Sequence, residues 1–135
     1  MMPTTTVHWV RDKQFVGIDS NNHAVVMSGD EPAQGVRPSQ MLLIGLAACT
    51  GYDVLDIMAK KRMPLSMLEI TASGTNDPDP PWPFRTIHLR YRVRGENIKD
   101  KALAQAIELS QEKYCSVAAT VRGVADISTE YEILP

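Results

Sequence analysis

The segment Pro38–Arg62, with the sequence PSQMLLIGLAACTGYDVLDIMAKKR, decides the fold because its residues favour one long and mostly apolar helix. Ser39 is a residue type that caps helix N-termini, and we expect the helix to run from Gln40 to about Arg62. Pro64 ends it, because the residue before a proline is pushed out of helical geometry. The first half is apolar on nearly all sides, which is typical of a helix in the middle of a structure.

The segments around this helix have patterns of short strands and shorter helices. The clearest strand is Arg85–Arg94, where apolar and cationic residues alternate strictly. The other expected elements are two or three antiparallel strands in residues 5–28 with a turn at 19–22, a loop at 30–36, a strand at 66–74, a proline-rich loop at 76–83, helices at 98–113 and 115–122, and a closing strand at 126–134. This order predicts an α+β fold with mostly antiparallel pairing, in one domain spanning residues 1–135.

Composition narrows the classes of function. The chain has 135 residues, 44% of them hydrophobic, and a net charge of −2 with no basic stripe, so we expect no nucleic-acid partner. No uninterrupted apolar run approaches the roughly 20 residues that span a bilayer, so we expect no membrane partner. The N-terminus lacks the pattern of a signal peptide. A cytoplasmic location is therefore expected, where a permanent structural disulfide would be unusual.

Cys49 and Cys115 are the two cysteines of the chain, and each lies in a segment with helical character. Neither has a nearby cysteine or histidine at the spacing of a metal site. The pattern favours two thiols that the fold brings together. The alternative for each is a packed structural cysteine, because free cysteine is among the most buried residue types.

Local charges favour Cys115 as the thiol with the lower pKa. It lies at the start of a predicted helix beside Lys113, where the positive end of the helix dipole stabilises a thiolate. Asp53, one turn after Cys49, would instead raise the pKa of the Cys49 thiol. Gly45, one turn before Cys49, is expected to allow another element to approach closely.

Other residue types give weaker signals. His8, His23 and His88 lie on predicted strands or turns without ligand spacing, so we expect no metal and no cofactor. The long apolar helix offers more surface than one layer of a chain this size would bury, which indicates a partner subunit.

Two cysteine-bearing segments, Arg37–Val54 and Glu112–Ala118, resemble the two cysteine motifs of the OsmC/Ohr family of thiol peroxidases. The similarity extends over essentially the whole chain. The opening Val7–Val10 and the turn Phe15–Gly17 resemble the OsmC-like branch rather than the Ohr branch.

The resemblance implies an intertwined homodimer, in which largely antiparallel sheets wrap around long central helices. It implies that Cys49 attacks an organic hydroperoxide and becomes a sulfenic acid, and that Cys115 resolves this acid to a disulfide. A lipoyl group or another dithiol would then reduce the disulfide.

The resemblance further implies an arginine and a glutamate that activate the first thiol. The glutamate position falls on Ser39 or Gln40, neither of which ionises, so Gln40 would be an orienting group. Arg11 and Arg37 are the candidates for the activating arginine. The missing glutamate motivates a second hypothesis from another class, a weakly or non-catalytic protein that binds a small apolar ligand at the dimer interface and has redox-sensing cysteines.

Overall fold

The computed structural model describes residues 2–29 and 34–135, and it divides into two compact units. The first unit is Met1–Leu42 and the second is Leu43–Pro135. Part of the loop expected at residues 30–36 lies outside the described residues, while Val36 forms a parallel bridge with Met27. The described residues have the mixed helix and strand composition that the sequence predicts.

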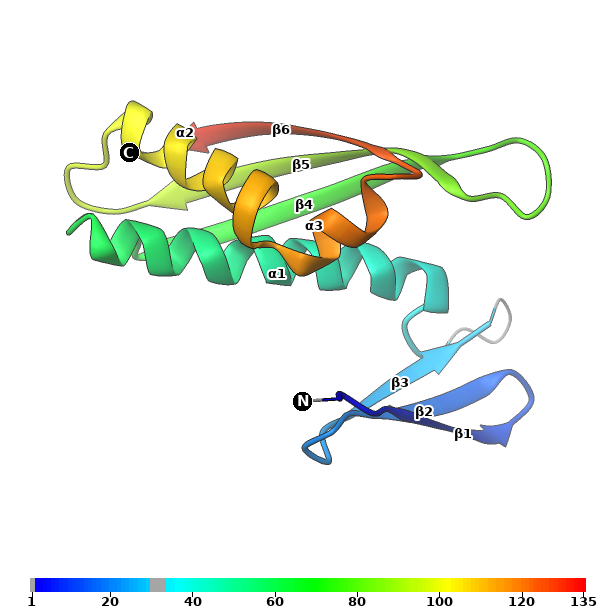
Figure 1. The fold of residues 1–135 in the computed structure, drawn as a ribbon. Coiled ribbons are helices and arrows are strands. Elements are labelled where there is room, and N and C mark those ends of the chain that lie inside the picture. Colours follow the sequence, from blue (N-terminus) through cyan, green and yellow to red (C-terminus); the bar gives the residue numbers. More distant parts are fainter. Residues whose placement is uncertain (1, 30–33) are drawn as a thin grey trace. The chain divides into compact units, whose positions relative to one another are not determined.

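The first unit contains a three-stranded antiparallel sheet in the order β1-β2-β3 (Figure 1). Its strands are β1 (Thr6–Arg11), β2 (Gln14–Ile18) and β3 (Ala24–Ser28). The turn expected at 19–22 is present, with the Asp19 carboxylate accepting the backbone N–H groups of Asn21 and His23 at 2.8 and 2.9 Å. Asn22 adopts a left-handed φ of 64°, which asparagine tolerates better than most residues.

Helix α1 (Pro38–Lys60) forms where the sequence predicts it, within two residues at each end. It ends with Arg62 in a left-handed conformation and with the Met63 N–H bonded to the Met58 carbonyl at 2.9 Å, just before Pro64. This arrangement satisfies carbonyl groups that the last turn would leave unpaired.

The second unit contains a sheet in the order β4-β5-β6, with helices on one of its faces (Figure 1). Its elements are β4 (Met67–Asn76), β5 (Phe84–Arg94), α2 (Asp100–Leu109), the π-helix η1 (Ser110–Tyr114), α3 (Ser116–Val121) and β6 (Asp126–Ile133). The helix predicted at 98–113 is therefore split, and its last turn is a wider π turn. The helix expected from Cys115 begins at Ser116 instead, with Cys115 as its cap.

The pairing is mostly antiparallel, as the sequence predicts, and the last strand is the exception. β4 and β5 are antiparallel, but β6 pairs parallel with β5 from Thr86↔Asp126 to Val93↔Ile133. The helices between β5 and β6 return the chain across the face of the sheet, so the next strand starts at the same end.

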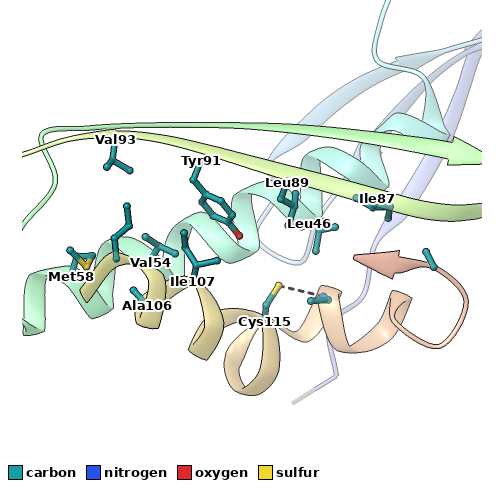
Figure 2. Close-up of a cluster of buried hydrophobic side chains, with 13 residues drawn as sticks. Leu46, Val54, Met58, Ile87, Leu89, Tyr91, Val93, Ala106, Ile107 and Cys115 are labelled. Atoms are coloured by element: carbon teal, nitrogen blue, oxygen red, sulfur yellow. Dashed lines mark hydrogen bonds between the residues drawn. The ribbon is translucent and has the colours of Figure 1, made fainter. Parts of the chain in front are cut away.

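The core of the second unit lies between the sheet and its helices. The alternating apolar residues of β5 point from the sheet toward the helices (Figure 2), and Leu89 and Tyr91 are completely buried. On the opposite face of the sheet, Arg90 and Arg92 pair with glutamates of β6 and β4 at 2.9 and 3.1 Å, as the solvated face of a strand should.

Helix α1 is long and apolar enough to cross a bilayer, with a mean hydropathy of 1.6 in an 18-residue window. Length and composition alone are weak evidence, because the core helix of a globular protein passes the same test. Asp53 and Asp56 interrupt its apolar sequence, and Leu46, Val54 and Met58 belong to the core of the second unit. The helix therefore has a structural role that requires no membrane.

We expect Leu89→Ala to lower the free energy of unfolding by about 2–5 kcal/mol, because it leaves a cavity at a fully buried position. Arg90→Ala, at the next residue on the solvated face, should cost no more than about 1 kcal/mol. Urea denaturation of both variants measures the difference, and equal losses would contradict the assignment of the two faces.

Candidate functional site

The two cysteines come from different elements of the second unit and lie close together. Cys49 is half-buried in the middle of α1, and Cys115 is buried, with 2% of its surface exposed, at the N-cap of α3. Both are free thiols, and Cys49 lies close enough to Cys115 to raise the pKa of its thiol. A pair of thiols that lie close together can be oxidised to a disulfide with little rearrangement.

The expected electrostatic order of the thiols is wrong for Cys115, because its pKa is raised to about 11. Burial is the largest cause, and the nearby Cys49 side chain adds to it. The helix N-terminus acts in the opposite direction through the Ala118 N–H, which donates to the sulfur at 3.4 Å (Figure 2). Lys113 lies over the ring of Tyr114, 5.6 Å from its centroid. The burial of the thiol thus outweighs a long hydrogen bond from a six-residue helix.

Gly51, rather than Gly45, is the glycine of α1 that allows a close approach within the described chain. A Cβ atom at Gly51 would lie 3.1 Å from Ile70 Cδ1 and 3.6 Å from Leu68 Cδ2, both on β4. A Cβ atom at Gly45 would meet no described atom within 4 Å. Gly51 therefore sets how closely the cysteine-bearing helix packs on the sheet.

A cluster of buried hydroxyl groups joins α1, β5 and η1, and one of its members, Thr50, directly follows Cys49. Thr50 Oγ1 is 2.7 Å from Tyr91 Oη and 2.8 Å from Ser110 Oγ, and all three side chains are completely buried. The Ser110 hydroxyl also donates to Asp53 Oδ2 at 2.8 Å. The Gln111 amide donates to Thr50 Oγ1 at 3.2 Å. We call these five residues the hydroxyl cluster.

The carboxylate of Asp53 gives the hydroxyl cluster a single direction. A carboxylate only accepts, so the one proton of Ser110 goes to Asp53, and Ser110 must accept from Thr50. Thr50 has then used its own proton, so it accepts from Tyr91. Burial raises the pKa of Tyr91 and keeps its phenol protonated as this donor. No hydroxyl can turn without leaving a buried partner unsatisfied.

Sequence reasoning misses most of this cluster. The alternation of apolar and polar residues along its strand places Tyr91 only on the apolar face. The position of Asp53 one turn after Cys49 suggests only that its carboxylate faces the Cys49 thiol. The available signal is that a buried tyrosine or serine needs a hydrogen-bond partner. One sequence cannot indicate which buried hydroxyl will meet which.

The other predicted site residues belong to the first unit. Arg11 is the exposed last residue of β1, beside the bulge at Trp9–Arg11. Arg37 precedes α1, and its carbonyl accepts the N–H groups of Gln40 and Met41 at 3.0 and 3.1 Å. Gln40 is exposed in the first turn of the helix. The roles of these three residues toward Cys49 stay predictions.

A groove of about 440 Å³ runs along α1, and several of the residues that line it are sequence neighbours of Cys49. Its lining is mostly apolar and comes from α1 and β4: Ala47, Ala48, Gly51, Tyr52, Leu55, Leu68 and Ile70. A larger cavity of about 790 Å³ lies along α2 and β6, but acidic residues such as Glu108 and Glu130 line it. The smaller groove is the one that suits an apolar molecule near the thiols.

Among residues 2–29 and 34–135, no three histidine, cysteine or acidic side chains gather as metal ligands would.

Comparison with known proteins agrees with the fold. Residues 29–130 match the family model described as OsmC-like protein. The chain belongs to the OsmC-like family. It is 32% identical over 128 residues to Protein YhfA of Escherichia coli strain K12, an alignment that covers 95% of this chain and 96% of that protein.

Solved structures also share the OsmC-like fold. A hypothetical protein from Aquifex aeolicus VF5 superposes with a TM-score of 0.90 at 27% identity, over 99% of this chain and 97% of that one. The organic hydroperoxide resistance protein OhrB of Bacillus subtilis superposes with a TM-score of 0.66 at 16% identity, over 98% of each chain. Likeness at this lower identity concerns the fold alone.

The raised pKa of Cys115 predicts that this OsmC-like protein loses stability at alkaline pH. The unfolded chain releases the thiol proton near the ordinary pKa of 9.0, whereas the folded protein holds it to about 11. Between these values the unfolded state binds fewer protons, so the free energy of unfolding should fall as the pH rises. Urea denaturation from about pH 8 to about pH 10.5 should show a smaller decline in Cys115→Ser than in the wild type. Parallel declines would contradict the assignment.

Proposed function

We propose that this protein is a thiol-dependent peroxidase that reduces organic hydroperoxides through Cys49 and Cys115. The observation that carries the proposal is the proximity of a half-buried thiol and a buried one, both reduced, on different elements of one unit. The substrate class is suggested by a structural relative, the organic hydroperoxide resistance protein OhrB of Bacillus subtilis.

The unequal burial of the thiols supports the order in which they react. With a pKa of about 11, Cys115 is thiolate in only about one molecule in 10⁴ at neutral pH, so it is a poor nucleophile toward peroxide. Cys49 is the more exposed thiol and is the proposed attacker. Arg11 or Arg37 would stabilise its thiolate, with Gln40 as the orienting group.

The proposed reaction has two steps on the protein. The Cys49 thiolate attacks the O–O bond, the alkoxide leaves and takes a proton to become an alcohol, and Cys49 becomes a sulfenic acid. The sulfur of Cys115 then displaces the sulfenic hydroxyl group, which leaves as water with the Cys115 proton, and a disulfide forms. An external dithiol, such as a lipoyl group, reduces the disulfide and is itself oxidised.

We further propose that a second copy of the chain covers α1. Ile44, Tyr52 and Leu55 follow one stripe of the helix and are 49%, 75% and 45% exposed, an apolar face that a monomer would leave in water. In the first unit, Val7, Trp9 and Val10 on β1 are also more than half exposed. A symmetric dimer would bury such surface with the same residues from each copy.

A second candidate function is the binding of a small apolar ligand without fast turnover. The groove of about 440 Å³ along α1 favours it, because the lining is mostly apolar and lies beside the thiol-bearing turn. On this hypothesis the cysteines would sense redox changes slowly, and hydroperoxide would not be consumed faster than by a free thiol.

The peroxidase proposal predicts that the reduced protein consumes cumene hydroperoxide with a burst of one equivalent and forms a Cys49–Cys115 disulfide. Cys49→Ser should lose at least about 10²-fold of the rate, because the attacking thiolate is absent. Cys115→Ser should keep the first burst but accumulate sulfenic acid, detected by a dimedone adduct. Stopped-flow absorbance and mass spectrometry measure both. Equal rates in the wild type and Cys49→Ser would exclude the proposal and leave ligand binding.

The dimer proposal predicts that the wild type sediments as a dimer. Ile44→Glu should raise the dimer dissociation constant at least about tenfold, because it places a charge on the apolar stripe of α1. Gln105→Glu makes the same change of charge at an exposed position of α2 and should leave the constant unchanged. Sedimentation equilibrium distinguishes these outcomes, and a monomeric wild type would overturn the proposal.

A further inference from the structure

Ser110 connects the two cysteine-bearing segments through both its side chain and its backbone. Its hydroxyl group bonds to Thr50, the residue after Cys49, at 2.8 Å. Its carbonyl accepts the backbone N–H of Cys115 at 2.8 Å. Two hydrogen bonds thus form a continuous path from the backbone of one cysteine segment to that of the other.

The π turn makes the position of Cys115 depend on this anchor. Residues Ser110–Tyr114 form one wide turn, and the bond from the Cys115 N–H to the Ser110 carbonyl closes it. π turns are rare and occur mostly as single turns, often at functional sites. Directly after the turn, Cys115 is extended, with a ψ of 106°, and caps α3. The Ser110 N–H bonds to the carbonyls of Ala106 and Ile107, so the backbone of α2 holds the start of the turn along the helix axis. The Ser110 side chain adds the anchor that ties this start to α1.

The anchor itself is strong and directional. Ser110 is completely buried, and it donates to a carboxylate while it accepts from Thr50. Hydrogen bonds to charged groups contribute more than neutral ones, and loss of Ser110 would leave both Asp53 and Thr50 without this partner. The rest of the hydroxyl cluster holds Thr50 in the orientation that this bond requires.

We propose that Ser110 is a positioning residue, which holds the Cys115 sulfur in bonding reach of Cys49 through Thr50 and Asp53 and so stabilises the disulfide. The proposal rests on the proposed function only in assuming that Cys49 and Cys115 form this bond. The equilibrium of an intramolecular disulfide depends on how closely and how often the fold brings the two thiols together. A looser π turn should therefore favour the dithiol.

The test measures the equilibrium between reduced protein plus oxidised glutathione and protein disulfide plus two reduced glutathione molecules. We expect Ser110→Ala and Thr50→Val each to lower the equilibrium constant about tenfold, the effect of losing one or two buried hydrogen bonds. Thr50→Ser keeps the hydroxyl and should remain within about threefold of the wild type. Acid-quenched samples analysed by mass spectrometry after alkylation give the constants.

Val93→Ala is the matched control for a general loss of stability. Val93 is completely buried on β5 and lies away from Cys115 in the core (Figure 2), so the variant should unfold more easily without moving the disulfide equilibrium. Urea denaturation of the reduced proteins shows whether its stability loss matches that of Ser110→Ala. If Ser110→Ala does not fold, the comparison of Thr50→Val with Thr50→Ser decides the question.

The outcomes separate this proposal from the proposed function. If the wild type forms no Cys49–Cys115 disulfide at any glutathione ratio, the resolving step and the positioning role both fail. If the wild type forms it but Ser110→Ala and Thr50→Val keep the same constant, only the positioning role fails. If the equilibrium constant falls as much in Val93→Ala as in Ser110→Ala, the positioning role of Ser110 is also overturned. Glutathione replaces hydroperoxide in this assay, so an absence of peroxidase activity does not affect the result.

Discussion

The hydrogen bond between Thr50 and Ser110 joins the long helix to the turn that carries the second cysteine. Ser110 is the buried residue of η1, and Tyr114 is exposed, so η1 offers no apolar side chain to the core that could hold it against α1. Apolar packing is also not directional and would not select one rotation of a turn. The bond has directional strength because Asp53 orients its donor and acceptor roles. The rest of the second unit supports this contact, since β5 supplies Tyr91 from the face that packs on the helices.

The state of Cys115 shows how burial and a helix N-terminus compete for the same thiol. Sequence position favours a thiolate stabilised by the dipole of the following helix. That helix has six residues, and the one hydrogen bond that it gives the sulfur is 3.4 Å long. Transfer of the charged thiolate into the core costs more than this hydrogen bond stabilises it, so the pKa rises. A helix-start signal is informative for a cysteine only when exposure is known as well.

The fold could be predicted from sequence wherever one periodic signal acted alone. The alternation of Arg85–Arg94 and the apolar stretch after Pro38 each allow a single regular structure, and both elements form as expected. The parallel pairing of β6 was missed because alternation is the same in parallel and antiparallel strands. The order of strand, helices and strand did contain that information, because such a crossover returns the chain to the same end of the sheet.

For the candidate site, the sequence indicates the kind of chemistry from its residue types but not which side chains contact each other. Two isolated cysteines indicate thiol chemistry, but the hydroxyl cluster depends on which of many serines, threonines and tyrosines become buried together. Gly51 illustrates the same limit: both glycines of α1 fit a close approach, and only packing against Ile70 and Leu68 distinguishes them. Pairwise contacts between distant segments have no local pattern, so one sequence does not reveal them.

A protonated Cys115 is consistent with its proposed place as the second thiol to react. The sulfenic hydroxyl group is a poor leaving group until it gains a proton, and a neighbouring thiol that still holds its proton can supply it as the S–S bond forms. A thiolate at this position would instead compete with Cys49 for peroxide and would have no proton to give. Burial therefore favours the proposed later step for Cys115, because the raised pKa that weakens it as a first nucleophile also keeps its proton available. In the proposed mechanism the hydroxyl cluster completes this arrangement, because a thiol that is to react with its neighbour must be held where that neighbour is.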